Sequence, residues 1–161
     1  MKRSVYHDLA ETIAKNPFGI PRVNGEASKA FVDFLALIYS PEEAVLGCYL
    51  RVYPFFKTAA DIAEASSLDM ASVKSILKGI HAKYAAMGLP ENDQHALPTI
   101  FYLFNFHHRY PEIKENDLDA AALYQQFFIE EGFYRRFGRN TGLSHHTHPS
   151  QYRGGSGGPD S

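Results

Sequence analysis

The sequence predicts a mainly α-helical chain that contains a winged helix-turn-helix with a short β-hairpin wing and flanking helices. Three features support this fold class. Apolar residues recur at spacings of three and four in successive segments of residues 1–137. A short helical segment and a longer one are separated only by a tight turn near residues 66–69, which is the layout of a helix-turn-helix. Residues 90–95 then form a polar, turn-forming segment between apolar residues, as a two-stranded wing requires.

Two helices are expected before residue 40. In the first, Val5, Leu9 and Ile13 recur at helical spacing. This helix ends at Asn16, because the following proline disfavours the helical conformation in the residue before it. The stretch from Phe18 to Gly25 is rich in turn-forming residues. A second helix follows, whose apolar stripe consists of Ala30, Phe31, Phe34, Leu35 and Ile38.

A third helix is predicted to begin at Pro41 and to end near Pro54. Ser40 can accept a hydrogen bond from the Glu43 amide while the Glu43 side chain reaches back, which forms a capping box. Proline suits the first helical position because it has no amide hydrogen to leave unpaired. Cys48 is expected to face the core. It is the only cysteine, so no internal disulfide, four-cysteine zinc site or conventional iron–sulfur cluster can form within the chain.

The helix-turn-helix is predicted over residues 58–84. Thr58 can cap its short helix, and its longer helix begins at Met70. Ala63 is small at the point where the two helices would touch, and Leu68 is expected to fill the corner between them. The apolar side of the longer helix consists of Val73, Ile76, Leu77, Ile80 and Tyr84.

The predicted domain is completed by an aromatic-rich segment, Thr99 to Tyr110, and a final amphipathic helix from Asp117 to Phe137. Most of these aromatic side chains are expected to pack in the core, because aromatic rings bury large areas. Phe127, Phe128 and Phe133 would form an exposed apolar patch if a covering domain is absent, and such a patch would favour self-association.

Charge and hydropathy limit the possible partners. Sixteen basic residues against eighteen acidic ones give no global attraction to nucleic acid or anionic membranes, so any such contact requires a local patch. The longest apolar stretches, such as Ile100 to Phe106, are far shorter than the ~20 residues of a membrane span. Residues 4–15 are polar and amphipathic, unlike the apolar block of a signal peptide. A cytoplasmic protein without membrane contact is expected.

The histidines do not form a recognisable catalytic or metal-binding motif. His145, His146 and His148 could chelate a metal from a flexible tail, but no carboxylate or cysteine in the sequence completes a site there. His107 and His108 have no serine, cysteine or paired carboxylate at motif spacing. The sequence therefore predicts no catalytic, cofactor or metal residues, and a protein that is not an enzyme.

Four segments between Tyr6 and Tyr134 carry a family resemblance. They are Pro17-Phe18-Gly19-Ile20-Pro21, Ser40-Pro41-Glu42-Glu43-Ala44, the helix-turn-helix from Ile62 to Leu77, and Phe127 to Tyr134 with its Glu130-Glu131-Gly132. Together they resemble the amino-terminal half of a prokaryotic family of ferredoxin-type iron–sulfur proteins, in which a winged-helix module precedes two 4Fe-4S clusters. The resemblance implies that the clusters belong to a carboxy-terminal half and that the full-length relative is an electron carrier, so no cofactor is expected in this chain.

The tail, residues 138–161, departs from that family. A proline-bearing linker and two cysteine-rich cluster motifs would be expected there, whereas residues 142–161 are rich in glycine, serine and histidine and contain no cysteine. Reading the codons of residues 148–157 one base out of frame permits a peptide similar to the expected linker. We therefore hypothesise that the tail is disordered or out of frame and that the chain is truncated. The nucleotide sequence of the gene would decide this.

Two functions remain open. The first is a non-enzymatic winged-helix interaction module that docks a protein partner or its own ferredoxin domain, and the near-neutral charge with abundant tyrosine and phenylalanine favours it. The alternative is a DNA-binding transcriptional regulator, in which Lys74, Lys78 and Lys83 on the longer helix contact phosphates. Acidic residues on the same unit and the absence of arginine from that helix disfavour the alternative. The sequence does not specify the oligomeric state.

Overall fold

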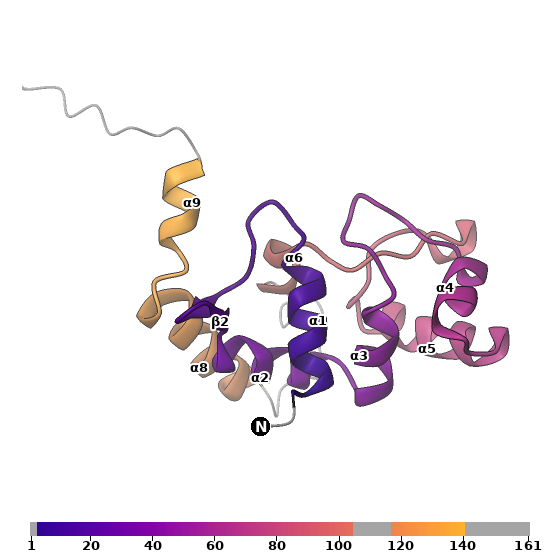
Figure 1. Cartoon of the computed structure of the whole chain (residues 1–161), viewed down its shortest axis with the longest axis horizontal. Coiled ribbons are helices and arrows are strands. Elements are labelled where there is room, and N and C mark those ends of the chain that lie inside the picture. The colour runs from indigo at the N-terminus through magenta and orange to yellow at the C-terminus, as the bar shows by residue number, and fades with distance from the viewer. Residues whose placement is uncertain (1–2, 105–116, 141–161) are drawn as a thin grey trace, which may run out of the picture.

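The computed structural model describes residues 3–104 and 117–140 (Figure 1). Its helices are α1 (Val5–Ile13), α2 (Lys29–Ile38), α3 (Pro41–Gly47), α4 (Ala59–Ser66), α5 (Met70–Ala82), α6 (Ile100–Phe104), α8 (Asp117–Tyr124) and α9 (Arg135–Asn140). A 3₁₀ turn occupies Pro90–Asn92, and a π-helical segment, Gln125–Glu130, continues α8. The strands are β1 (Arg22–Val23) and β2 (Glu26–Ala27). The prediction of a mainly α-helical chain is confirmed.

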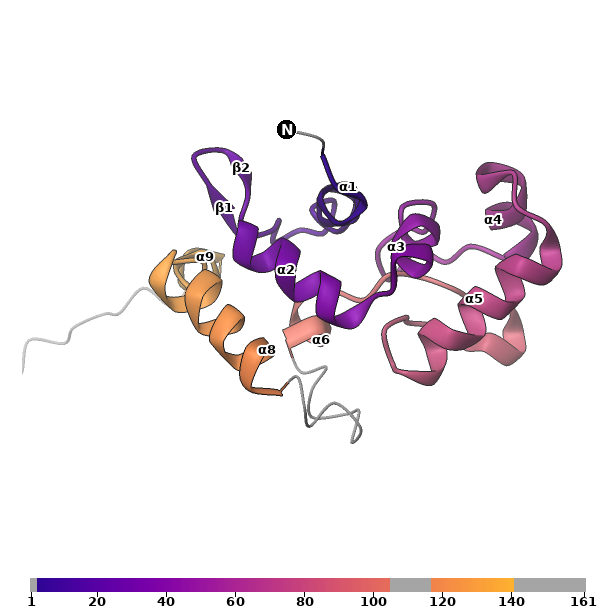
Figure 2. The same ribbon diagram turned by 90° about the horizontal axis from the view of Figure 1, so that it is seen from below.

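The helices are arranged with α2 near the centre. Figures 1 and 2 show α4 and α5 at one end of the molecule and α8 and α9 at the other, with α1, α2, α3 and α6 between them. Helix α2 contacts both α1 and α8, while α3 contacts α1 and α5. Helix α3 therefore connects the α4–α5 unit to the rest of the core. No helix in the described residues is long and apolar enough to cross a membrane.

Side-chain caps start α3, α4 and α5, three of the helices that the sequence predicts. Ser40 and Glu43 form the predicted capping box at the start of α3. Thr58 caps α4 and forms a second box with Asp61. Asp69 accepts a backbone N–H one turn into α5 and so starts the longer helix. The predicted succession of short helix, turn and longer helix is therefore present, although Leu68 is 37% exposed and does not fill the corner between the two helices.

Helix α3 is shorter than predicted. It ends at Gly47, and the prediction that it extends to near Pro54 is wrong. The following backbone pairs with a distant segment instead, since the Tyr53 amide donates to the Leu97 carbonyl and the Leu97 amide donates to the Arg51 carbonyl. These bonds hold the chain extended, which a helix would not allow. Cys48 is only partly buried, and its thiol donates to a carbonyl within the same helical turn.

The prediction of a single helix from Asp117 to Phe137 is also wrong. Gly132 interrupts it with a φ of +77°, a conformation that glycine adopts without steric cost. The chain then turns and places Phe133 in the core, where it is 5% exposed. Phe127 is fully buried as well. The prediction that Phe127, Phe128 and Phe133 form an exposed patch is therefore wrong for Phe127 and Phe133.

The two-stranded sheet lies in the segment that the sequence marked only as rich in turns. Arg22 lies opposite Ala27 in the antiparallel register, and the two residues between the strands both have positive φ, 52° for Asn24 and 83° for Gly25. Such angles characterise the two-residue type I′ turn, which Asn-Gly favours because both residues tolerate positive φ. The hairpin is thus specified by a local signal.

At the predicted wing, antiparallel pairing is limited to single bridges. Lys57 pairs with His95, and Met87 pairs with Ala96. Positive φ values at Gly88 and Asp93 interrupt the extended backbone on the two sides of the Pro90–Asn92 turn, so no regular strand forms there among the described residues. The β-hairpin predicted here is therefore not formed as a pair of regular strands within the described residues.

Candidate functional site

Two long-range contacts fix the carboxy-terminal end of α5. The Tyr39 hydroxyl, which is buried, donates to the Ala85 carbonyl at 2.7 Å. Burial raises the pKa of Tyr39, so the hydroxyl remains a donor at neutral pH. The Lys83 ammonium donates to the Ile38 carbonyl at 2.9 Å and forms an ion pair with the Glu43 carboxylate. Together these contacts hold α5 against the ends of α2 and α3.

The three lysines predicted to contact DNA phosphates do not act as one group. Lys74 and Lys78 are exposed, lie one turn apart on α5 and line the same pocket. Lys83 is the C-cap residue of α5, and its φ of −96° places it outside the regular helix. Its side chain is only 22% exposed because of its contacts with Ile38 and Glu43. The structure therefore brings Lys74 and Lys78 together and places Lys83 elsewhere.

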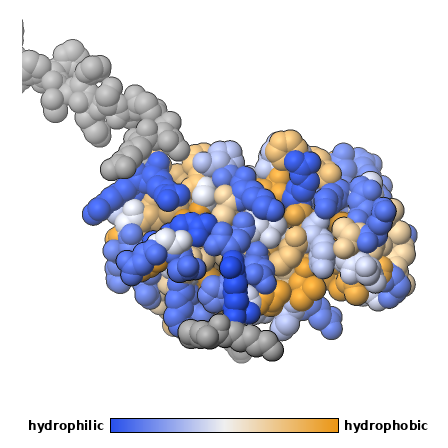
Figure 3. Space-filling view, viewed as in Figure 1, coloured by the Kyte–Doolittle hydropathy of each residue, from blue (hydrophilic) through white to orange (hydrophobic). Residues whose placement is uncertain are grey.

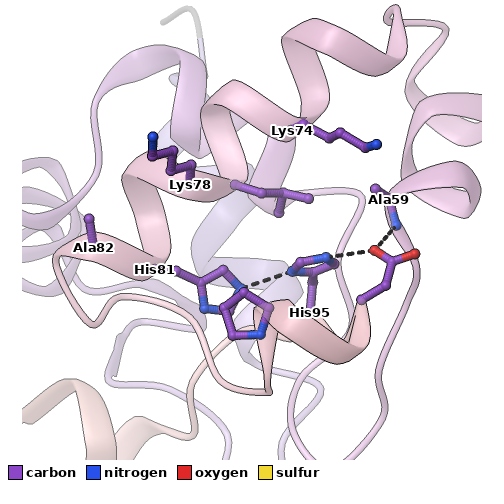
Figure 4. A pocket seen from close by; sticks show the side chains of 9 residues that line it. Ala59, Lys74, Lys78, His81, Ala82 and His95 are labelled. Atoms are coloured by element: carbon purple, nitrogen blue, oxygen red, sulfur yellow. Dashed lines mark hydrogen bonds and ion pairs between the residues drawn. The ribbon is translucent and has the colours of Figure 1, made fainter.

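A pocket of about 490 Å³ lies between α5 and the segment that carries His95 (Figure 4). Its lining residues are Ala59, Lys74, Leu77, Lys78, His81, Ala82, Pro90, Asp93 and His95. In Figure 4, Lys74 and Lys78 project from α5, while the rings of His81 and His95 face each other below them. The pocket thus combines apolar walls with a few polar groups, as small-molecule sites commonly do.

His81, His95 and Asp93 form a chain of hydrogen bonds. His81 Nε2 lies 2.9 Å from His95 Nδ1, and His95 Nε2 lies 2.9 Å from Asp93 Oδ1. The same Asp93 oxygen accepts the Ala59 amide at 2.9 Å. Because an ionised carboxylate only accepts, His95 Nε2 carries a proton, and the contact between the rings joins His95 Nδ1 to His81 Nε2. The contact between the rings requires one N–H and one lone pair, so both rings cannot be cationic while it persists.

The electrostatics of this chain keep His81 neutral. Burial and the adjacent His95 lower the pKa of His81 to about 4. The pKa of Asp93 is lowered by the Ala59 amide first, and then by His95 and the charge of Lys74, which together outweigh the opposing effect of burial and keep this carboxylate ionised. The site at neutral pH therefore contains two lysine ammonium groups, one hydrogen-bonded carboxylate and a neutral His81 that is hydrogen-bonded to His95.

Acid is expected to destabilise the protein between pH 6.5 and 4 through His81. Its pKa falls from 6.5 to about 4 on folding, so the unfolded chain takes up this proton first as the pH falls. The unfolded state binds more protons across this window, and the free energy of unfolding therefore decreases as pH falls. Because His81 is partly exposed, we expect a loss of about 1–2 kcal/mol, less than the full shift would imply. Urea unfolding at pH 7, 5.5 and 4 measures this decrease in the free energy of unfolding.

His81→Gln is the control for this titration, because its amide can still donate to His95 Nδ1 without gaining a charge. The difference in stability between pH 7 and pH 4 should shrink by the same amount in the variant. An unchanged pH dependence in His81→Gln would contradict the assignment of this titration to His81.

No pattern in the sequence connects the residues of this pocket. His81 and His95 are fourteen positions apart and belong to a helix and a loop, so no motif spacing relates them. The only local signal in the sequence is the apolar run that follows His95. A histidine that is buried beside such residues, as His95 is, needs hydrogen-bond partners. His107, His108, His145, His146 and His148 lie outside the described residues.

A second feature is the aromatic loop, which we define as residues 49–56. Tyr49, Tyr53, Phe55 and Phe56 are each between 36% and 55% exposed. The rings of Tyr53 and Phe56 meet edge to face with centroids 5.8 Å apart, and the Arg51 guanidinium lies 4.4 Å from the Phe55 ring centroid. Figure 3 shows apolar surface on this face over α3 and the loop that follows it. The rings are thus exposed on a backbone that the bonds to Leu97 hold in place.

Comparison of the chain with protein-family models, curated proteins and solved structures gives no match. The resemblance to ferredoxin-type iron–sulfur proteins therefore stays a prediction. Within the described residues, no group of three or more histidine, cysteine, aspartate or glutamate side chains could hold a metal ion.

Proposed function

We propose that this chain is a non-enzymatic winged-helix module that docks a protein partner through the aromatic loop. The observation that carries the proposal is the exposure of Tyr49, Tyr53, Phe55 and Phe56 within eight consecutive residues. Clustered exposed apolar side chains beside polar surface are typical of protein interaction sites. Tyrosine, phenylalanine and arginine are also enriched in the cores of such interfaces.

Support for the winged-helix assignment comes from the order of elements. Helices α3, α4 and α5 are followed by the segment that pairs on one side with Lys57 and on the other with Met87. A winged helix packs a small antiparallel sheet in this position, and here the sheet would be reduced to single residue pairs. Fold alone does not specify function, so the docking proposal depends on the loop.

The fixed backbone of the loop favours binding. Its amide and carbonyl groups at Arg51 and Tyr53 are bonded to Leu97, and the Lys57 ammonium donates to the Tyr49 carbonyl at 2.8 Å. Ordering a flexible loop costs free energy on association, and a loop that is already ordered avoids much of that cost. Phe55 and Phe56 would then bury apolar area against a partner with little rearrangement.

The family resemblance suggests the kind of partner. A ferredoxin-type domain with two 4Fe-4S clusters follows the winged-helix module in the proteins that this chain resembles. We therefore propose such a domain, attached or separate, as the surface that covers the aromatic loop. In this proposal the clusters belong to the partner, and this chain contributes no cluster ligand.

Phe55→Ala is expected to weaken binding to a purified two-cluster ferredoxin-type domain of the resembled family by about 30-fold, the effect of a hot-spot residue of about 2 kcal/mol. Phe55 is 55% exposed, so its removal should leave the fold intact. Titration calorimetry measures the affinity, and circular dichroism checks the fold. Leu118→Ala is the matched control, because Leu118 is 82% exposed on α8, away from the loop that follows α3.

Equal losses for the two variants, or no binding by the unaltered chain, would contradict this docking proposal. The DNA-binding alternative remains supported by Lys74 and Lys78, which are exposed on the helix that follows the turn. Double-stranded DNA is therefore the second probe. Affinity that decreases as salt increases, and that Lys74→Gln reduces, would favour the regulator over the docking module.

A further inference from the structure

We propose that the pocket between α5 and residues 90–95 binds a small organic monoanion, a carboxylate with an apolar body. This inference is independent of the docking function. It rests on the combination of an apolar cavity, two lysines that form no ion pair in the described part of the chain, although the charge of Lys74 acts on Asp93, and a pair of imidazoles held in a fixed orientation.

The size and walls of the pocket suit an apolar molecule. Its volume of about 490 Å³ lies within the range of roughly 300–1,000 Å³ that is usual for small-molecule sites. Leu77 and Ala82 form the wall on α5, and Ala59 and Pro90 contribute from the facing segments. An aliphatic chain or a single aromatic ring would gain free energy by leaving water for these walls.

The charges favour a single negative group. Lys74 and Lys78 line the pocket, and neither ammonium is within ion-pair distance of a carboxylate in the described part of the chain. Asp93 is the one carboxylate in the lining, and its Oδ1 already accepts bonds from Ala59 and His95. With neutral His81, two cations and one anion leave a net charge of +1. A monoanion would neutralise it.

A phosphate group fits less well. Phosphates commonly bind the free amides at a helix amino-terminus, but at α4 the Ala59 amide is bonded to Asp93 and the Asp61 amide to Thr58. A carboxylate needs only the lysine ammonium groups as donors, and these are available. The pocket chemistry therefore points to the carboxylate.

The imidazole pair makes the floor of the pocket rigid. His95 is buried and bonded at both ring nitrogens, and His81 is bonded to it at Nε2. A ligand seated here would contact α4, α5 and the Pro90–Asn92 turn together, and so would stabilise the α4–α5 unit against unfolding.

Hexanoate and benzoate are the probes, with hexanamide and benzamide as uncharged analogues of the same shape. We expect the acids to bind with dissociation constants on the order of 1 mM, which is typical of molecules with so few atoms. They should shift the ring signals of His81 and His95 in NMR spectra. The amides should bind about tenfold more weakly, because the lysines then lose a charged acceptor.

The double variant Lys74→Gln with Lys78→Gln should weaken hexanoate binding by at least about tenfold. Lys29→Gln is the matched control, because Lys29 is an exposed lysine on α2 that pairs with Asp33. Ala82→Leu provides a second test, since it adds volume to the pocket wall from an exposed helical position and should also abolish binding.

Three results would overturn the proposal. The first is no shift of the histidine signals by either acid. The second is equal binding of acids and amides, or equal loss in Lys29→Gln and the double variant. The third is binding of inorganic phosphate as tightly as the carboxylates, which would assign the pocket to phosphate compounds.

Discussion

Replacing Phe127 by alanine is expected to lower the free energy of unfolding by about 3–5 kcal/mol, a large part of the stability of a domain this size. Phe127 is fully buried where α2, α6 and α8 meet. Its ring lies 5.5 Å from those of Phe31 and Phe34 and 5.7 Å from that of Phe104, measured between centroids. Alanine would lose all of these contacts and leave a cavity that the surrounding helices can only partly fill.

Ile129→Ala is the matched control for Phe127→Ala. Ile129 belongs to the same π-helical segment but is 52% exposed, so its truncation should cost no more than about 1 kcal/mol. Chemical denaturation followed by circular dichroism gives both values. Similar costs for the two variants would mean that the carboxy-terminal segment does not pack against α2 as described.

Gly88→Ala is expected to cost about 3 kcal/mol or more. Gly88 has a φ of +110°, which side chains other than glycine rarely adopt. A Cβ atom there would overlap the Gln94 carbonyl oxygen and lie 2.8 Å from its carbon, so backbone would have to move. The Phe56 ring, with Cε1 3.1 Å from that Cβ, would be displaced too. The change should therefore loosen both the Met87–Ala96 bridge and one edge of the aromatic loop.

Gly25→Ala is the control that measures the cost of backbone strain without steric overlap of the added Cβ atom. Gly25 also has positive φ, +83°, but nothing lies within 4 Å of an added Cβ. Its cost should be limited to the conformational penalty of about 1 kcal/mol. Thermal and urea unfolding of both variants measure the difference, and NMR of the His81–His95 pair reports local opening in Gly88→Ala. Equal stability of the two variants would show that residues 88–94 are not packed as closely as described.

Local signals in the sequence predicted much of the helical framework. The Ser40–Glu43 capping box and the cap at Thr58 are both formed, because each depends only on residues within one helical turn. The helix-turn spacing from Ala59 to Ala82 follows for the same reason. The Asn24-Gly25 hairpin was also present as a local signal, although the sequence analysis took it only as a turn.

Contacts between distant segments decided the elements that the sequence predicted wrongly. Helix α3 does not continue to Pro54 because Arg51 and Tyr53 pair with Leu97, about 45 positions away. The last helix breaks at Gly132, where the turn lets Phe133 reach the core beside Phe104. In both places tertiary pairing or burial outweighs helical periodicity, because propensity contributes less per residue than packing does.

By itself, the sequence determined where most helices begin, which faces of them are apolar and that the turn before α5 is short, since these follow from interactions between near neighbours. Only the tertiary structure decided which charged and aromatic groups meet. Lys83 pairs with Glu43 forty positions away, while Lys74 and Lys78 line the pocket. His81 contacts His95 where α5 packs against the loop. The candidate site arises from packing, because side chains from elements that are separate in sequence share a hydrogen bond or a cavity only after those elements have packed.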